Sequence, residues 1–268
     1  MLRTLFRSFL CVCAASVLLG CQTTPTGRRQ LQLFPSEQVA QMGDQAYNQL
    51  RKQEPIAKDP TLNRYVECVT QAVVAVVSKP QGGGDWKVAV FESDQVNAFA
   101  LPGGNIGVYA GLLKAARTPD QLAAVIGHEI AHVQAEHSNA RLSTQYATEA
   151  GLSLIQALGH GSAVENRNVL ALLGLGAQVG ILLPFSRAQE TEADVLGLRY
   201  MAEAGFDPRA AVELWQNMAK VGGNGPPAFL STHPSGEQRI RVLSEHLPEA
   251  LERYRQAQAA GRRPTCQP

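Results

Sequence analysis

The sequence predicts an α+β fold, a mainly helical single domain with a small mixed β-sheet. Several long stretches after residue 36 carry apolar side chains at three- and four-residue steps, which is typical of helices that bury one face. Short alternating stretches between residues 86 and 109 are typical of strands. The chain has 268 residues, of which 45% are hydrophobic and 18% charged, so it can bury one sizeable core.

The first 20 residues are predicted to be a secretory signal that is removed. Arg3 and Arg7 precede an apolar run over residues 9–19, which ends just before Cys21. This run is too short to cross a bilayer comfortably. Removal of the signal takes two of the 24 basic residues and leaves 22 against 23 acidic ones, so the formal net charge falls from +1 to −1.

Residues 18–21, Leu-Leu-Gly-Cys, resemble a bacterial lipobox, in which Cys21 becomes the lipid-modified first residue. The alternative is an ordinary signal peptide with a chance cysteine. Gln22 stands where an inner-membrane retention signal would have Asp, which favours the periplasmic face of the outer membrane. The expected organisation is a removed signal over 1–20, a loop-like lipid-anchored tether over 21–35, a folded domain over 36–250 and a C-terminal tail over 251–268.

Two cysteines are left over for the folded domain. Of the five in the chain, Cys11 and Cys13 leave with the signal and Cys21 carries lipid, so Cys68 and Cys266 remain. An even pair in an oxidising compartment predicts a disulfide between them. The alternative is two unpaired thiols.

The elements are expected in the following order. Helices should cover residues 36–50, 60–77, 119 to about 137, 187–204 and 208–220, and strands should cover 86–91, 95–101 and 105–109. The helix from Pro119 has the best-marked start, because Thr118 can cap it and Gln121 completes a capping box. An apolar stretch over 169–183 would span roughly 22 Å as a helix, which is short for a bilayer core, so a buried or interfacial helix is expected.

The composition argues against one class of partner. Only 6% of the residues are aromatic, the net charge is close to zero, and no basic stripe with interleaved aromatics occurs. Nucleic acid is therefore not an expected partner.

The stretch Gly127 to His137, GHEIAHVQAEH, has the residue types of a zinc site. His128 and His132 are four residues apart, so on a helix both imidazoles can reach one ion. Glu129 projects beside them and can take a proton from a water activated by the metal. The alternative is an exposed helix face with unrelated histidines, and a third protein ligand is needed to decide.

His137 is a poor candidate for that third ligand. It follows His132 by five residues, about 140° around a continuous helix, so it is expected to be a surface residue. A metzincin would have Gly at 135 and His at 138, where this chain has Ala135 and Ser138.

A better candidate lies on the later helix that contains Glu190 and Asp194. These two carboxylates are four residues apart and share a face, so one can bind zinc while the other orients a ligating histidine. Glu192 lies about 160° from Asp194 on the helix and is expected to face solvent. The alternative for the pair is a solvated acidic face.

Four motifs in order resemble the gluzincin metallopeptidases related to CAAX-prenyl proteases, HtpX and the mitochondrial overlapping-activity peptidase. They are NAFALPGG from Asn97, HEIAH, SRAQETEAD and Thr232-His233-Pro234 with Arg239. The resemblance is strongest to small bacterial outer-membrane lipoprotein members. It implies one zinc ion per chain on His128, His132 and Glu190, with Glu129 as general base and Asp194 in the second ligand shell. The small sheet is then expected beside the HEIAH helix.

The resemblance also implies roles for residues outside the ligand set. Asn97, Ala98 and Phe99 would lie on a strand that pairs with an extended substrate, although a plain core strand is the alternative. His233 would either fill the fourth zinc position and hold the enzyme idle, or stabilise the oxyanion; a loop histidine is the alternative. Arg187 and Arg239 are candidates for bracing Asp194 or the substrate.

These inferences predict a zinc endopeptidase that cleaves unfolded or misassembled envelope proteins and is tethered through Cys21. The outer-membrane assembly machinery is a candidate partner by resemblance. One alternative is a chaperone-like envelope assembly factor with little or latent proteolysis. Another is a structural lipoprotein whose zinc site is closed by four protein ligands.

Overall fold

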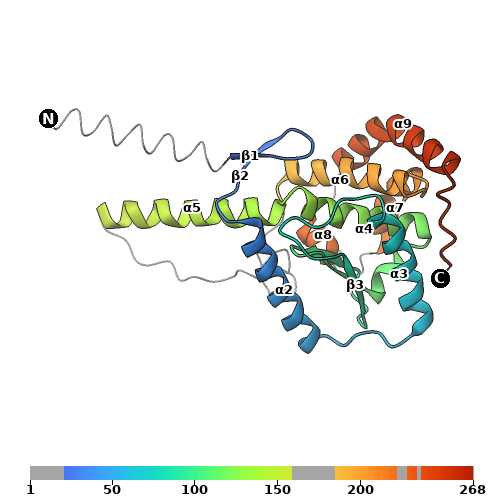
Figure 1. The fold of residues 1–268 in the computed structure, drawn as a ribbon, viewed down its shortest axis with the longest axis horizontal. Coiled ribbons are helices and arrows are strands. Elements are labelled where there is room, and N and C mark those ends of the chain that lie inside the picture. The colour runs from blue at the N-terminus through green and yellow to red at the C-terminus, as the bar shows by residue number, and fades with distance from the viewer. Residues whose placement is uncertain (1–20, 159–184, 222–227, 234–236, 268) are drawn as a thin grey trace.

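The computed structural model describes residues 21–158, 185–221, 228–233 and 237–267 (Figure 1). The described chain is mainly helical with a small mixed sheet, so the predicted α+β class is confirmed. The apolar stretch 169–183 lies outside these residues. Within the described part of the chain, every helix is too short or too polar to cross a membrane.

The predicted helices and strands form, with shifts at their ends. The helices are α2 (Ser36–Gln53), α3 (Pro60–Val74), α4 (Pro119–Gln134), α5 (His137–Leu158), α6 (Arg187–Glu203), α7 (Arg209–Val221), α8 (Ala228–Thr232) and α9 (Glu237–Ala259), with a short 3-10 helix η1 (Ala110–Lys114). The strands are β1 (Cys21–Thr23), β2 (Arg29–Leu31), β3 (Lys87–Phe91), β4 (Ala98–Leu101) and β5 (Asn105–Tyr109). Of these elements, α5, α8, α9, β1 and β2 are found in addition to the predicted ones.

The sheet is mixed, with the order β3-β5-β4. Strand β5 pairs in parallel with β3 and antiparallel with β4, where Phe99 lies opposite Gly107. Strand β4 is therefore at an edge of this sheet, and α4 packs against it. All residues of β4 and β5 are buried, which makes the sheet a rigid support beside α4.

Helix α4 is the central helix of the fold. It starts where the sequence predicts, with the Thr118 hydroxyl accepting a hydrogen bond from the Gln121 backbone at 3.2 Å. It is buried from Gln121 to Gln134, with neighbours on several sides, among them β4, α6 and α7. It ends earlier than expected, because Glu136 adopts a positive φ of 51° and the chain restarts as α5 at His137.

The N-terminal tether differs from the loop expected from its polar composition. Residues 21–31 form an antiparallel hairpin in which Gln22 lies opposite Gln30. This hairpin, blue in Figure 1, lies against the start of α6, and β2 also packs on α5. The segment after Cys21 is thus part of the folded structure.

The C-terminal region also differs from the sequence-based division at residue 250. Helix α9 passes through Pro248 and continues to Ala259, and it packs against α6 and α7. Beyond it, Cys266 forms a disulfide with Cys68 on α3, across a sequence separation of 198 residues. The last part of the chain is therefore held to the body of the domain.

Candidate metal centre

The site forms where α4 and α6 approach each other closely. A Cβ atom on Gly197 would lie only 2.7 Å from the backbone N of His128, and one on Gly127 only 2.8 Å from the backbone O of Gly197. Glycine at both positions therefore allows the two helix backbones to touch. Ser186 caps α6 with a reciprocal capping box, so the first turn, which carries Glu190, is firmly placed.

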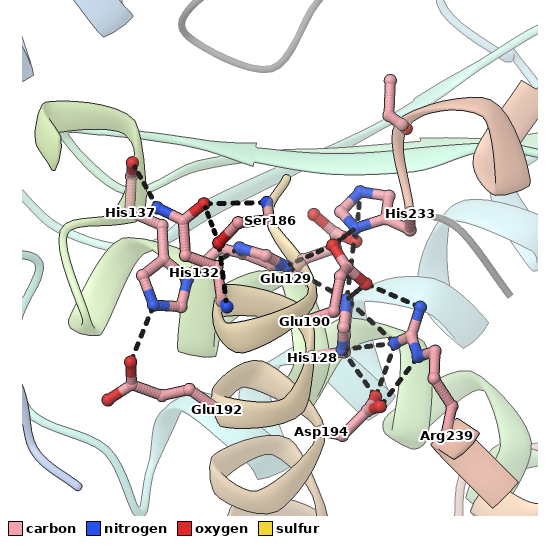
Figure 2. A network of polar contacts seen from close by, with 12 residues as sticks. His128, Glu129, His132, His137, Ser186, Glu190, Glu192, Asp194, His233 and Arg239 are labelled. Atoms are coloured by element: carbon pink, nitrogen blue, oxygen red, sulfur yellow. Dashed lines mark hydrogen bonds and ion pairs between the residues drawn. The ribbon is translucent and has the colours of Figure 1, made fainter. Parts of the chain in front are cut away.

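Four side chains direct donor atoms toward one point (Figure 2). One donor atom from each of four residues lies within 4.8 Å of all the others: His128, His132, Glu190 and His233. The Nε2 atoms of His128 and His132 are 3.1 Å apart, and His233 Nδ1 lies 3.2 Å from His128 Nε2. Glu190 Oε1 lies 3.0 Å from His233 Nδ1 and 3.6 Å from His132 Nε2.

These separations fit a tetrahedral zinc ion. Zinc bonds of about 2.0–2.1 Å place neighbouring donors roughly 3.3 Å apart, within the 3.0–3.6 Å range of the four separations above. All four residues are at most 3% exposed, so their donor atoms are shielded from bulk solvent. Nitrogen and carboxylate donors are those that zinc prefers. The residues present therefore fit the metal that the sequence predicts.

Asp194 and Arg239 support the ligands from behind. Asp194 Oδ1 lies 3.1 Å from His128 Nδ1, the nitrogen that faces away from the other donors. Arg239 donates two hydrogen bonds to Asp194, at 2.7 and 2.5 Å, and its Nη1 lies 2.6 Å from Glu190 Oε2. Burial disfavours the charged form of Asp194, but the Arg239 guanidinium keeps the pKa of that carboxyl below its usual value.

Aromatic rings complete the walls of the centre. The guanidinium carbon of Arg239 lies 3.6 Å from the ring centroid of Trp215, a cation–π contact that fixes the arginine. Phe185 packs on His132, and Phe229 stacks on His233. The sequence alone gives no sign that Trp215 holds Arg239.

Glu129 lies beside the donors with one oxygen available. It is 3% exposed, and among the described residues its Oε1 has no hydrogen-bond partner; His233 Nε2 lies 3.4 Å from that oxygen. The backbone of Ala100 on β4 favours the charged form of this carboxylate and so lowers its pKa. Burial raises the pKa of Glu129, and His233 and His128 oppose that shift.

The remaining candidates lie at the start of strand β4, where Phe99 packs against Phe91 and Tyr109 in the core. Asn97, Ala98 and Phe99 are all buried, and the side chain of Asn97 accepts a hydrogen bond from the Ala98 backbone at 3.0 Å. Phe229 on α8 donates its backbone N–H to Val96, so α8 covers the strand's start. Arg187 is exposed at the start of α6 and forms no ion pair with Asp194 in the described structure.

Two expectations from the helical wheel are wrong. His137, expected at the surface, is 0% exposed and its Nδ1 lies 2.9 Å from His132 Nδ1. Glu192, expected to face solvent, is 4% exposed and its Oε2 lies 3.1 Å from His137 Nε2. The cause is the backbone turn at Glu136, because it directs His137 back toward α4 instead of continuing the helix.

Comparison with known proteins places this site in a family. The model of peptidase family M48 matches residues 60–247, a stretch that contains the HEIAH helix, Glu190 and His233. The chain belongs to peptidase family M48. This confirms the resemblance to the gluzincin peptidases that was inferred from the four motifs.

Relatives of known name include both mitochondrial and bacterial proteins. The chain is 41% identical over 190 residues to the mitochondrial metalloendopeptidase OMA1 of Schizosaccharomyces pombe, covering 69% of this chain and 53% of that protein. It is 36% identical over 246 residues to the OMA1 metalloendopeptidase of Danio rerio, covering 85% and 50%. It is 31% identical over 210 residues to the beta-barrel assembly-enhancing protease of Escherichia coli, covering 76% and 42%. The chain therefore spans about half the length of these relatives.

Proposed function

We propose that this chain is a zinc endopeptidase that cleaves unfolded or misassembled proteins of the cell envelope, tethered to the periplasmic face of the outer membrane through Cys21. The observation that carries the catalytic part is the convergence of His128, His132 and Glu190 beside a buried Glu129. The envelope assignment is supported by the lipobox-like sequence at Cys21 and by similarity to the beta-barrel assembly-enhancing protease.

The metal, the general base and the supporting residues have separate roles in the proposed reaction. A bound zinc ion supplies Lewis-acid chemistry, which polarises a peptide carbonyl and makes water more acidic. Glu129 accepts the proton of the attacking water on Oε1, the oxygen without a hydrogen-bond partner among the described residues, and passes it to the leaving amine. Asp194 and Arg239 hold the His128 ring in orientation throughout.

Strand β4 supplies a means of holding an extended substrate. In the antiparallel ladder the Tyr109 backbone N–H donates to Asn97, and the register continues from there with Phe99 opposite Gly107. Alternation along the strand then directs the backbone groups of Ala98 and Ala100 away from β5, on the side where the Ala98 N–H donates to the Asn97 side chain. A substrate strand added at this edge would be recognised mainly through its backbone, as suits unfolded proteins of varied sequence.

A direct test combines metal analysis with cleavage of casein and of an unfolded porin. The purified protein should contain one zinc ion per chain and cleave both substrates. Glu129→Gln should retain zinc and lose activity by about 10²- to 10⁴-fold, because only the proton acceptor is removed. Full loss of zinc in this variant, or undiminished cleavage, would contradict the assigned role. Rescue of an envelope-stress defect by Glu129→Gln would instead favour a chaperone-like assembly factor.

One observation favours a latent form of the enzyme. His233 contributes a fourth donor, and a centre with four protein ligands leaves no position for substrate. His233→Ala should raise peptidase activity or cause self-cleavage if His233 holds the enzyme idle. Lower activity with intact zinc would favour oxyanion stabilisation. If neither the wild type nor His233→Ala cleaves substrate, and His233→Ala loses its zinc, the structural lipoprotein would be favoured.

A further inference from the structure

The two histidines of the HEIAH motif are oriented in different ways. Each directs Nε2 toward the other donors, which leaves Nδ1 for a supporting partner. His128 Nδ1 lies 3.1 Å from a carboxylate oxygen of Asp194. His132 Nδ1 instead lies 2.9 Å from Nδ1 of a second histidine, His137 (Figure 2). The Nε2 atom of His137 lies 3.1 Å from Glu192 Oε2.

This chain of contacts has one consistent arrangement of protons. A neutral His132 that offers the Nε2 lone pair to a metal carries its proton on Nδ1 and donates it to His137 Nδ1. His137 then carries its own proton on Nε2 and donates it to the Glu192 carboxylate. Every nitrogen in this fully buried pair of rings has a partner only in this arrangement.

The N-terminal hairpin holds Glu192 in place. The Thr26 hydroxyl donates to Glu192 Oε1 at 2.5 Å, and Arg28 Nε donates to Glu192 Oε2 at 2.7 Å. The Gln30 side chain donates to the backbone carbonyl of Ala135 at 2.6 Å, which holds the hairpin to the turn before His137. The segment that follows Cys21 therefore contacts Glu192, the far end of the contact chain, and Ala135, two residues before His137.

We propose that His137 and Glu192 form a positioning relay that fixes the tautomer and orientation of His132, and that Arg28 in the N-terminal hairpin holds this relay. The hairpin thereby sets the affinity of the centre for zinc. Neither relay residue belongs to the four-donor set, so both act through His132. The inference rests on the zinc-binding part of the proposed function and extends it to the segment beside the expected lipid anchor.

The test measures zinc affinity by chelator competition in the full chain carrying Glu129→Gln, so that no proteolysis occurs. His137→Phe keeps a ring but removes the acceptor nitrogen, and should weaken zinc binding by about 10- to 100-fold. Glu192→Leu should have a similar effect, whereas Glu192→Gln, which keeps an acceptor oxygen, should lose less. Arg28→Met should weaken binding measurably. Arg29→Met should leave it unchanged, because Arg29 is exposed and has no side-chain contact with Glu192 in the described structure.

A double-mutant cycle separates a relay from a cluster that only stabilises the fold. If both residues act through His132, adding Glu192→Leu to His137→Phe should weaken zinc binding no further. Cobalt-loaded protein should also change its visible spectrum in the single variants, because the His132 ligand is reoriented. Wild-type zinc affinity in His137→Phe, or fully additive losses, would overturn the relay.

Two outcomes of the same experiment bear on folding and on the proposed function. The side chain of Arg28 is 29% exposed, so Arg28→Met against Arg29→Met remains decisive where a buried variant does not fold. Equal zinc affinity in those two proteins would then refute the relay. Absence of zinc binding in the parent protein would refute the proposed function as well, whereas normal parental binding with unaffected variants would refute the relay alone.

Discussion

Arg239→Met should be among the most destabilising single changes in the chain. Arg239 is 5% exposed and lies between two buried carboxylates, with two hydrogen bonds to Asp194 and Nη1 at 2.6 Å from Glu190. Methionine keeps much of the apolar stem but removes the charge and the guanidinium that lies over Trp215. Two buried carboxylates then lose the arginine that pairs with both of them in the metal-free protein.

The size of the effect follows from the burial. Removing one partner of a buried ion pair costs about 3–5 kcal/mol, because the remaining charge stays desolvated. For a chain of this size each kcal/mol lowers the melting temperature by roughly 2–4 °C, so a fall of roughly 6–20 °C is expected. Urea unfolding of chelator-treated protein measures the free energy directly, with the metal excluded from the comparison.

Arg241→Met is a matched control on the same helix. Arg241 pairs with Glu245 at 3.8 Å, but the two side chains are 70% and 61% exposed. An exposed pair of this kind contributes about 0–1 kcal/mol, so this variant should be close to wild type. A loss of less than about 1 kcal/mol for Arg239→Met would refute the account of the buried pair.

The pH dependence gives an independent check of the same account. The folded pKa of Asp194 is lowered, so its stabilising contribution is present above its unfolded pKa of about 3.9 and is lost as pH falls through the folded value. In Arg239→Met the unpaired carboxylates are relieved by protonation. The difference in unfolding free energy between wild type and variant should therefore be largest near neutral pH and should shrink as pH falls toward 4. A difference that grows on acidification would contradict this sign.

Three further changes test other parts of the structure. Cys266→Ser should lower the free energy of unfolding by about 2–5 kcal/mol, and reductant should destabilise the wild type but not this variant. Gly197→Ala should force α6 away from α4, because its Cβ would lie 2.7 Å from the His128 backbone, and should lower kcat/KM for casein by about 10²-fold; an unchanged rate would argue against this close contact. Ser186→Ala should cost about 1 kcal/mol through loss of the α6 cap, as measured by urea unfolding, while Ser186→Thr should retain most of the stability.

The sequence predicts the elements whose pattern is local. Apolar periodicity and the Thr118 cap locate α4 and its start, and alternation locates β3 and β5 within one residue of their observed ends. Helix α9 gives no such signal, since it is rich in charged side chains and contains Pro248. It is held in place by packing against α6 and α7, which a local pattern does not reveal.

Helical spacing in the sequence limited the donors to His128, His132 and one of Glu190 and Asp194, and the family resemblance implied Glu190. His128 and His132 share a face of α4, and Glu190 lies four residues before Asp194 on α6, so a single close contact between two helices brings all of them together. That contact depends on Gly127 and Gly197, whose role is visible only when the helix backbones are seen to touch. Spacing therefore predicts which residues can bind, and packing decides that they do meet.

The residues around His132 were misjudged for a definite physical reason. The prediction for His137 assumed a continuous helix, but the positive φ at Glu136 breaks the helix and reverses the direction in which the next side chain points. Once His137 turns inward it needs an acceptor, and Glu192 meets that need from the face of α6 expected to be solvated. Glu192 in turn can stay charged at 4% exposure only with cationic and hydroxyl donors, which the hairpin supplies through Arg28 and Thr26. The backbone turn at Glu136 thus explains why His137 and Glu192 are both buried. It also explains why the polar segment after Cys21 packs against Glu192.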